Sequence, residues 1–349
     1  MKTFTKFTTA IMVLSVLLFS SCKEDSINPD MGYSDGILVV CEGNFNGLDG
    51  DITYISDTSV TKGIFAKANG IPLGDIIQSL TIIDDKAYIV ANNSQKIEVV
   101  DSKTFKSIGT ITGLSFPRYV AKISDSEIAV SNGDGFGNNY IYFINTSTYS
   151  KIDSIAVGAG PNKMLIHNNK LYVANMGGWS NDKTISVITL SNKQVSATIE
   201  VGDLPADMEL DKNNNIILLC IGLTTYDENW TPTIVSNSKL QKINTTDNSV
   251  TTIKEFDHQV ANFSSNGLAY CNETIYYLDD AVYAISASNT TPIKLIDGYF
   301  YGLDCNPITK DIWVTSTPST GTHKVIQFSP SGTKIKEYLT GFYPNAVVF

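Results

Sequence analysis

The chain repeats one pattern of short apolar runs along most of its length, and this repeat limits the folds open to it. Between Lys170 and Asn214, four runs rich in β-branched residues are separated by turn-forming Asn, Ser, Asp and Gly, as in KLYVANMGGWSNDKTISVITLSNKQVSATIEVGDLPADMELDKNN. Six further segments follow the same order and begin near Ile37, Lys86, Glu127, Asn215, Glu273 and Asp311. A unit of roughly forty residues with four strands is the size of one propeller blade. The sequence therefore predicts an all-β fold, a seven-bladed β-propeller.

The two ends of the repeat are offset, and the offset predicts how the ring closes. The last segment, Pro344 to Phe349, matches the innermost strand of the other copies, whereas the first, Ile37 to Cys41, matches their second strand. One blade is then shared by the N- and C-terminal strands, which covers edges that an open repeat leaves exposed. A β-solenoid is the alternative, but it does not need this offset. We expect residues 35–349 to form a single propeller domain.

Residues 1–22 have the pattern of a secretory leader. Two lysines precede the apolar run Ala10–Phe19, which is too short and wrongly flanked for a membrane-spanning helix. The leader ends in Ser-Ser-Cys22 and resembles a bacterial lipoprotein signal, in which Cys22 becomes the acylated N-terminus. Ordinary cleavage beside an incidental cysteine is the alternative. The resemblance implies anchoring to the outer membrane through a lipid, with residues 23–34 as a flexible tether.

The residues directly after Cys22 bear on where the protein is displayed. Lys23-Glu24-Asp25 resembles the short export tag of Bacteroidetes lipoproteins that are shown on the outer surface. Any solvated tether can carry the same charges. The resemblance implies exposure on the cell surface, and an anchor that faces the periplasm stays open.

The charge argues against one class of partner, and the cysteines do not indicate a metal site. The net charge of −10 argues against nucleic acid, because binding to phosphates depends on clustered Lys and Arg. Cys41 and Cys220 fall in apolar strands, as small buried thiols do. Cys271 and Cys305 end the inner strands of neighbouring blades, where a disulfide is open but not established by sequence. No CxxC motif or Cys/His cluster indicates a metal, and we expect no cofactor.

The repeat register separates two unlike faces of the ring. The loops between second and third strands, together with the loops that enter each blade, emerge on one side. The long members of the first group are Glu42–Asp51, Asn132–Asn139, Asn175–Lys183 and Thr224–Lys239. Blades two and six have only Ala91–Lys96 and Asp279-Asp280 at this place. Uneven loops of this kind predict a cleft above the central channel.

Aromatic, amide and charged side chains gather on these loops and at the channel mouth. Exposed rings beside Asn and Gly suit a large, flat, mostly uncharged ligand or a protein partner. The candidate ligand-binding residues are Asn44, Phe45, Phe116, Arg118, Phe136, Tyr140, Lys163, Trp179, Asp207, Tyr226, Trp230, Tyr301 and Tyr343. Gln78, Asn266 and Asn345 are also expected at the mouth. Arg118, Lys163 and Asp207 either hold a polar group of the ligand or pair with one another to close the channel.

The sequence favours binding over catalysis. Only three histidines occur, His167, His258 and His323, and none stands beside a plausible nucleophile and acid. The glycines of GDGFGNN lie between strands and not before a helix, so they do not form a dinucleotide fingerprint. We expect no enzymatic activity. The alternative is a propeller hydrolase or lactonase with Glu42, Asp134 and Asp207 around a metal.

Two sets of segments carry a resemblance to known families. LYVAN, TISVI and ATIEVGDLP resemble the YncE-like propellers over nearly the whole chain after the leader. ILVVCEGNFNGLDGDITYIS resembles the opening blade of Bacteroidetes surface lipoproteins of the BtuG type. That resemblance implies capture of cobalamin or another corrinoid and transfer to a BtuB-like TonB-dependent transporter. A surface propeller that binds a glycan or a protein in nutrient uptake or adhesion is the alternative.

Overall fold

The computed structural model describes residues 32–33, 35–260, 266–286 and 289–349. The predicted signal peptide, Cys22 and all of the predicted tether except residues 32–33 lie outside the described residues. Tyr33–Phe349 form one compact unit, and Met1–Gly32 are assigned to a separate one. Within the described ranges, no helix has both the length and the apolar character needed to cross a membrane.

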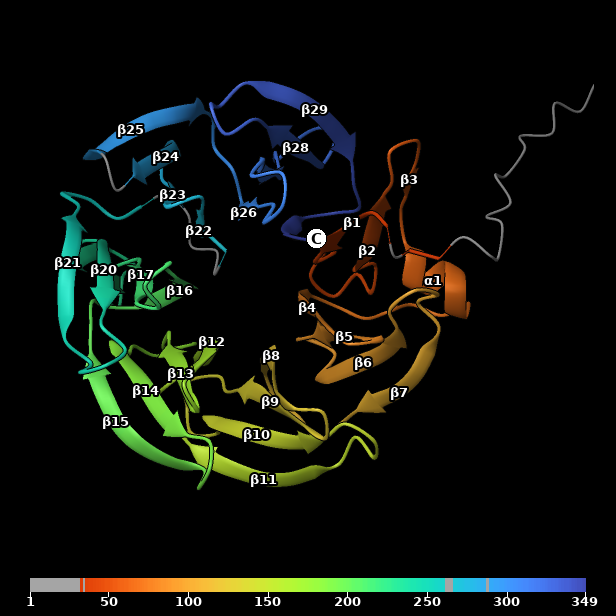
Figure 1. The fold of residues 1–349 in the computed structure, drawn as a ribbon, viewed down its shortest axis with the longest axis horizontal. Helices are drawn as coiled ribbons and strands as arrows, with labels where there is room; N and C mark the ends of the chain where they lie inside the picture. Colours follow the sequence, from red (N-terminus) through yellow and green to blue (C-terminus); the bar gives the residue numbers. More distant parts are fainter. Residues whose placement is uncertain (1–31, 34, 261–265, 287–288) are drawn as a thin grey trace, which may run out of the picture. The chain divides into compact units, whose positions relative to one another are not determined.

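Seven four-stranded antiparallel sheets are arranged as blades around a central channel, so the predicted seven-bladed β-propeller is confirmed (Figure 1). Blade 1 contains β30 (Pro344–Val348), β1 (Ile37–Cys41), β2 (Asp51–Ile55) and β3 (Val60–Thr61). Blade 2 contains β4 (Ile77–Ile83), β5 (Lys86–Ala91), β6 (Lys96–Asp101) and β7 (Ser107–Ile111). Blade 3 contains β8 (Pro117–Ser124), β9 (Glu127–Asn132), β10 (Tyr140–Asn145) and β11 (Lys151–Ala156).

The remaining four blades follow in chain order around the ring. Blade 4 contains β12 (Pro161–His167), β13 (Lys170–Asn175), β14 (Thr184–Thr189) and β15 (Gln194–Glu200). Blade 5 contains β16 (Pro205–Leu210), β17 (Ile216–Cys220), β20 (Lys239–Ile243) and β21 (Val250–Glu255). Blade 6 contains β22 (Leu268–Cys271), β23 (Thr274–Leu278), β24 (Ala281–Ser286) and β25 (Asn289–Asp297). Blade 7 contains β26 (Gly302–Cys305), β27 (Ile312–Ser316), β28 (Lys324–Phe328) and β29 (Lys334–Leu339).

Blade 1 closes the ring as the sequence offset predicts. Strand β30 pairs antiparallel with β1, with Leu38 opposite Val348 and Val40 opposite Ala346. The two strands come from opposite ends of the propeller sequence. Their pairing leaves neither end of the repeat as an open edge.

The hydrophobic core lies between neighbouring blades. Middle strands such as β17 are buried along their whole length, because each blade packs both faces against its neighbours. Val90 of blade 2 meets Val130 of blade 3 in one such layer, and Leu219 of blade 5 meets Tyr277 of blade 6 in another. Outermost strands such as β11 are mostly exposed. This gradient explains why the second strand of each repeat is the most apolar.

Blade 1 differs from the others at its outer edge. Its fourth strand, β3, has two residues and is followed by the only helix of the described chain, α1 (Ile64–Asn69). The Asp51 carboxylate accepts hydrogen bonds from the backbone N–H groups of Phe65 and Ala66, both at 3.0 Å, and so caps the helix. Ile64 and Phe65 are fully buried, so the helix completes the packing that the short strand leaves open.

Of the four described cysteines, two form a disulfide and two are free. Cys271 and Cys305 form a disulfide with their Cα atoms 6.4 Å apart, which joins the inner strands of blades 6 and 7. Cys41 and Cys220 are free and buried, as expected for small thiols in apolar strands.

Candidate functional site

Two kinds of loop meet on one side of the ring, called here the loop face. They are the loops between second and third strands and the loops that enter each blade. Gly133 donates its N–H to the carbonyl of Phe116 at 3.1 Å, and Met176 does the same to Gly160 at 3.0 Å. The opposite side, the turn face, carries short turns such as those at Asp84 and Asn168. The structure therefore confirms the predicted division into two faces.

The loops of blades 3 and 4 are locked together. The backbone N–H of Trp179 donates to the carbonyl of Asp134 at 2.7 Å, and the Ser180 hydroxyl donates to the carbonyl of Gly135 at 3.1 Å. Gly135 has φ 95°, and a Cβ there would lie 2.0 Å from the Gly177 oxygen, so the contact needs a glycine. The pair presents Phe136 and Trp179 to solvent, 72% and 71% exposed.

The long loop of blade 5 is not an irregular loop. It contains a two-stranded hairpin, β18 (Leu223–Tyr226) and β19 (Pro232–Ser236), formed by a run rich in Thr, Ile and Val. The Thr224 hydroxyl donates to the Gln259 amide oxygen at 2.7 Å and so fixes the base of the hairpin. Its end carries Tyr226 and Trp230, whose ring centroids are 6.1 Å apart and which are 59% and 80% exposed.

The loop of blade 1 holds its own shape. Asn44 donates from its backbone N–H and its side-chain amide to the two oxygens of Asp49, both at 2.7 Å. Asn44 therefore stabilises the loop with the amide that was predicted to bind a ligand. Phe45 is 72% exposed. Tyr343, on the loop that enters the same blade, packs against His323 in a tilted arrangement with 4.7 Å between ring centroids.

Three predicted site residues are partly used within the protein. Phe116 is half-buried beside the loop of blade 3. Tyr140 lies at the start of β10 and stacks on Tyr142 with 5.9 Å between ring centroids. Tyr301 donates its hydroxyl to the Glu42 carboxylate at 3.1 Å across the channel mouth. The remaining exposed rings on the long loops, Phe45, Phe136, Trp179, Tyr226 and Trp230, are called here the loop rim.

A cavity of about 470 Å³ occupies the central channel. Polar side chains from the inner strands and Glu42 line its loop-face end. They include Glu42, Gln78, Arg118, Lys163, Asn266, Tyr301 and Asn345. Asp304 and Glu209 also line the cavity, and sequence reasoning missed both. Their signal was their place on inner strands, two residues beyond Asp207 for Glu209 and three beyond Tyr301 for Asp304.

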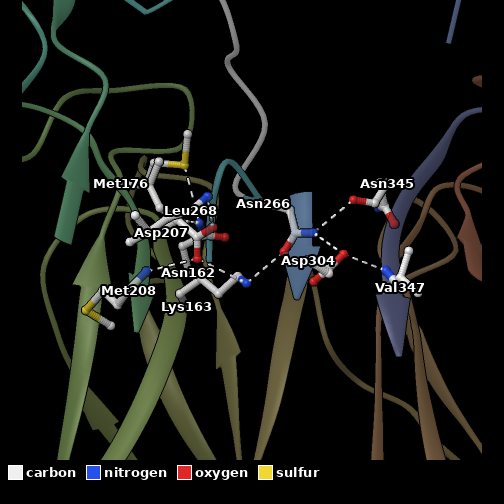
Figure 2. Close-up of polar contacts among 11 residues, drawn as sticks. Asn162, Lys163, Met176, Asp207, Met208, Asn266, Leu268, Asp304, Asn345 and Val347 are labelled. Atoms are coloured by element: carbon white, nitrogen blue, oxygen red, sulfur yellow. Dashed lines mark hydrogen bonds and ion pairs between the residues drawn. The ribbon is translucent and has the colours of Figure 1, made fainter. Parts of the chain in front are cut away.

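Lys163 and Asp207 pair with each other, which is one of the two outcomes the sequence left open. Lys163 Nζ lies 3.1 Å from Asp207 Oδ1 and 3.0 Å from Asn266 Oδ1. Figure 2 shows these side chains pointing toward one another. Asp207 is fully buried and also accepts the N–H groups of Met208 and Leu268 at 2.9 and 3.0 Å. Burial opposes the charge on Lys163, but Asp207 holds the pKa of Lys163 above its usual range.

Hydrogen bonds continue this contact around the channel. Asn266 donates to Asp304 Oδ2 and to the Asn345 carbonyl, both at 3.1 Å. Both contacts are drawn in Figure 2. The Asn345 amide reaches Glu42 at 2.9 Å, and on the other side Arg118 Nε donates to Asn162 Oδ1 at 3.2 Å. We call this set the channel belt, which consists of Glu42, Arg118, Asn162, Lys163, Asp207, Asn266, Asp304 and Asn345. It links inner strands of all the blades except blade 2 by side chains, and it reaches blade 2 through the Gln78 carbonyl.

Burial raises the pKa values of the channel carboxyls. The pKa of Asp304 rises to about 7, and that of Glu209 to about 8 with a further contribution from Asp207. Burial also raises the pKa of Glu42, against the hydrogen bonds from Asn345 and Tyr301 that lower it. The cavity therefore carries less negative charge near neutral pH than the number of its acids implies.

The three acids of the metal-dependent alternative are not grouped together in the structure. Among the described residues, no three His, Cys, Asp or Glu side chains are grouped so that they could hold a metal ion. Asp207 is occupied by Lys163, and Asp134 Oδ1 accepts the N–H of Phe136 at 2.9 Å. The structure does not assemble Glu42, Asp134 and Asp207 into one site.

The fold and the site define a seven-bladed β-propeller with a polar belt in its channel and exposed aromatic rings on one face. Residues 35–349 match the family model DUF5074, described as a domain of unknown function, and the chain belongs to that family. No curated protein matches the sequence.

Solved structures resemble the fold at low sequence identity. A quinonprotein alcohol dehydrogenase-like protein from Bacteroides thetaiotaomicron has 17% identity and a TM-score of 0.70, with 92% of this chain and 79% of that chain covered. BamB from Moraxella catarrhalis has 14% identity and a TM-score of 0.53, with 87% and 83% covered. The computationally designed protein Ika8 has 12% identity and a TM-score of 0.56, with 87% of each chain covered. These similarities show the fold alone, because one fold hosts many functions.

Proposed function

We propose that this protein is a non-catalytic, lipid-anchored protein of the outer membrane that is exposed on the cell surface and captures a large ligand on its loop face. The observation that carries the proposal is the loop rim, whose five rings are 59–80% exposed. Aromatic rings gathered on loops of one face are costly in water and favour a binding surface.

The ligand we propose is a corrinoid such as cobalamin. A corrin ring is a broad disc edged with amides, so aromatic rings can stack on it while Asn side chains hydrogen-bond to its edge. The loops that carry the rim are already fixed by hydrogen bonds such as Trp179 N–H to Asp134 and Thr224 to Gln259. A preformed site loses less entropy on binding. We propose further that the ligand passes to a TonB-dependent transporter of the BtuB type.

The contacts of Tyr33, at the start of the described propeller, support the proposal that the loop face captures the ligand. Tyr33 donates its N–H to the carbonyl of Lys103 at 2.7 Å, and its ring packs 5.5 Å from Phe105 and 5.0 Å from Tyr54. Lys103 lies in a turn of the turn face. The described propeller therefore begins at the turn face, and the rim lies on the loop face.

Calorimetry on protein lacking residues 1–22 tests the ligand. We expect tight binding of cyanocobalamin, and a loss of about tenfold or more when Trp179 and Trp230 are both changed to Ala, since each stacked ring contributes about 0.5–1.5 kcal/mol beyond its buried area. Ile308→Ala is the matched control, because Ile308 is 86% exposed on the turn face. Unaltered binding in the double variant shows that the site is elsewhere. Glycan binding without corrinoid binding favours the oligosaccharide alternative.

Fractionation of intact cells tests the anchor and its side. We expect wild-type protein in the outer-membrane fraction and accessible to added protease. Cys22→Ser removes the acylated residue, so this variant leaves the membrane fraction. Protection of the wild type from protease in intact cells places the anchor on the periplasmic side instead.

A further inference from the structure

The two cations of the channel belt have different partners. Lys163 is neutralised by Asp207 at 3.1 Å and also lies 5.2 Å over the Tyr119 ring. Arg118 donates from Nε to the neutral Asn162 amide at 3.2 Å. Among the described residues, no carboxylate lies within ion-pair distance of the Arg118 guanidinium, although the structure brings several into the same cavity.

The acids near Arg118 are engaged elsewhere. Glu42 accepts hydrogen bonds from Tyr301 at 3.1 Å and from Asn345 at 2.9 Å. Asp304 accepts the Asn266 amide and the Val347 N–H at 2.7 Å. These contacts hold both carboxylates on the side of blades 6, 7 and 1. Arg118 projects from blade 3 with donor groups left over, because a guanidinium carries five N–H groups.

A second donor lies beside it on blade 2. Gln78 lines the same end of the cavity, and its side-chain amide makes no hydrogen bond with the described residues. Its backbone carbonyl accepts the Asn345 amide at 3.2 Å, which fixes the position of the residue. Arg118 and Gln78 therefore place N–H donors from neighbouring blades at the mouth of one cavity.

We propose that Arg118, assisted by Gln78, binds an oxyanion group of the ligand, a phosphate ester or a carboxylate, at the mouth of the central channel. Glu42 attracts the Arg118 charge without a direct ion pair, and an incoming oxyanion supplies the missing contact through charge-assisted hydrogen bonds. The inference deepens the proposed function, on which it rests, by naming the part of the ligand that enters the channel. The rest of the ligand lies on the loop rim.

The size of the cavity agrees with a side group. At about 470 Å³ the cavity lies within the range of small-molecule pockets, about 300–1,000 Å³, so it has room for one side group of a larger ligand. A broad ring system stays on the rim, and a phosphate or carboxylate on a short arm reaches Arg118. A corrinoid with its nucleotide has such a group in its phosphodiester.

Inorganic phosphate is the direct probe. Titration at constant ionic strength, followed by ³¹P NMR, is expected to show binding to the wild type and an affinity about 10- to 100-fold lower for Arg118→Gln, the range for a lost hydrogen bond to a charged group. Arg118→Lys keeps the charge without the planar fork and should fall between the two. Lys122→Gln, which removes one positive charge on the turn face, is the matched control and should leave phosphate affinity unchanged.

Thermal melting separates binding from a structural role. Because Arg118 lacks an ion pair, Arg118→Gln should melt at or above the wild-type temperature, and phosphate should raise the melting temperature only where Arg118 is present. The proposal is overturned if tens of millimolar phosphate neither bind nor stabilise the wild type. It is also overturned if Arg118→Gln binds phosphate as the wild type does.

Two corrinoids that differ in the phosphodiester test whether the anion site binds that group of the proposed ligand. Cobalamin carries the phosphodiester and cobinamide has the same ring without it. We expect the wild type to favour cobalamin by about 10- to 100-fold and Arg118→Gln to lose that preference. Equal affinity of the wild type for both corrinoids overturns the placement of the phosphodiester at Arg118. Phosphate binding that depends on Arg118, together with no corrinoid binding at all, removes the corrinoid proposal and leaves the anion site standing.

Discussion

The channel belt and the loop rim differ in the environment of their side chains. Those of the belt contact one another in the channel, and those of the rim are exposed to solvent. In the belt, Asp207 is fully buried and pairs with Lys163, whose side chain is mostly covered. In the rim, Trp179 and Trp230 are held in water by loops whose backbones are fixed. Arg118 belongs to the belt by position but has no ion pair within the described chain. The contrast agrees with the proposal, in which the belt pairs stabilise the fold and the unpaired groups bind ligand.

Breaking the central pair of the belt is expected to have the largest effect. Asp207→Ala leaves the Lys163 ammonium buried without its partner and frees the N–H groups of Met208 and Leu268. We expect a loss of about 3–5 kcal/mol in the free energy of unfolding, measured with urea. Lys163→Met combined with Asp207→Leu removes both charges and should recover much of that loss. A loss below about 1 kcal/mol in the single variant contradicts a structural role for the pair.

The disulfide supports the opposite end of the same channel. Cys271 and Cys305 are 34 residues apart in sequence and join two inner strands. Replacing both with Ser should cost about 2–4 kcal/mol, because the cross-link restricts the unfolded chain. Reductant should lower the urea midpoint of the wild type to that of the variant and leave the variant unchanged. A wild type that is insensitive to reductant would show that this link contributes little.

Glu209 should make the free energy of unfolding depend on pH, because its carboxyl is in the channel. Burial raises its pKa from 4.5 to about 8, so the folded protein holds a proton that the unfolded chain releases between these values. The wild type therefore loses stability from this group as pH rises from about 4.5 to 8. Glu209→Gln should be more stable than the wild type by more than about 1 kcal/mol at pH 8, with the difference vanishing near pH 4.5. If the stability difference between the wild type and Glu209→Gln is the same at every pH, titration of Glu209 is not its cause.

The rim is expected to give the smallest effect on stability. Trp230→Ala and Phe136→Ala remove side chains that are 80% and 72% exposed, so each should change the free energy of unfolding by no more than about 0.5 kcal/mol. Trp313→Ala is the buried counterpart, because Trp313 is 2% exposed, and should cost about 3–5 kcal/mol. A large loss in the rim variants, measured by the same urea unfolding, assigns the rings to packing and weakens the binding proposal.

Much of the fold follows from short-range sequence pattern. The repeat predicted the blades, their number and the shared blade, because strand alternation and turn residues act over a few positions. The unequal loop lengths followed directly from the spacing between strands. The hairpin of blade 5 was missed, since its run Thr231 to Val235 sits inside a segment interpreted as one loop. The short β3 and helix α1 were also missed, because helix α1 has only six residues.

The channel belt is harder to predict because its contacts join residues far apart in the chain. Lys163 and Asn266 are 103 positions apart, and Asn345 and Glu42 are 303 apart. Sequence placed the side chains at the mouth but left open whether Lys163 binds a ligand or pairs with Asp207. That choice depends on distances across the ring, which no local pattern contains.

The pairing of β30 with β1 has a consequence during synthesis. The ribosome makes Ile37–Cys41 among the first described strands and Pro344–Val348 last, so the first of these strands waits for nearly the whole polypeptide before its inner neighbour exists. Blade 1 cannot be completed until Pro344–Val348 has been translated. Through that interval the unpaired edge of β1 is open to other β-strands, so incorrect pairing competes with closure of the ring.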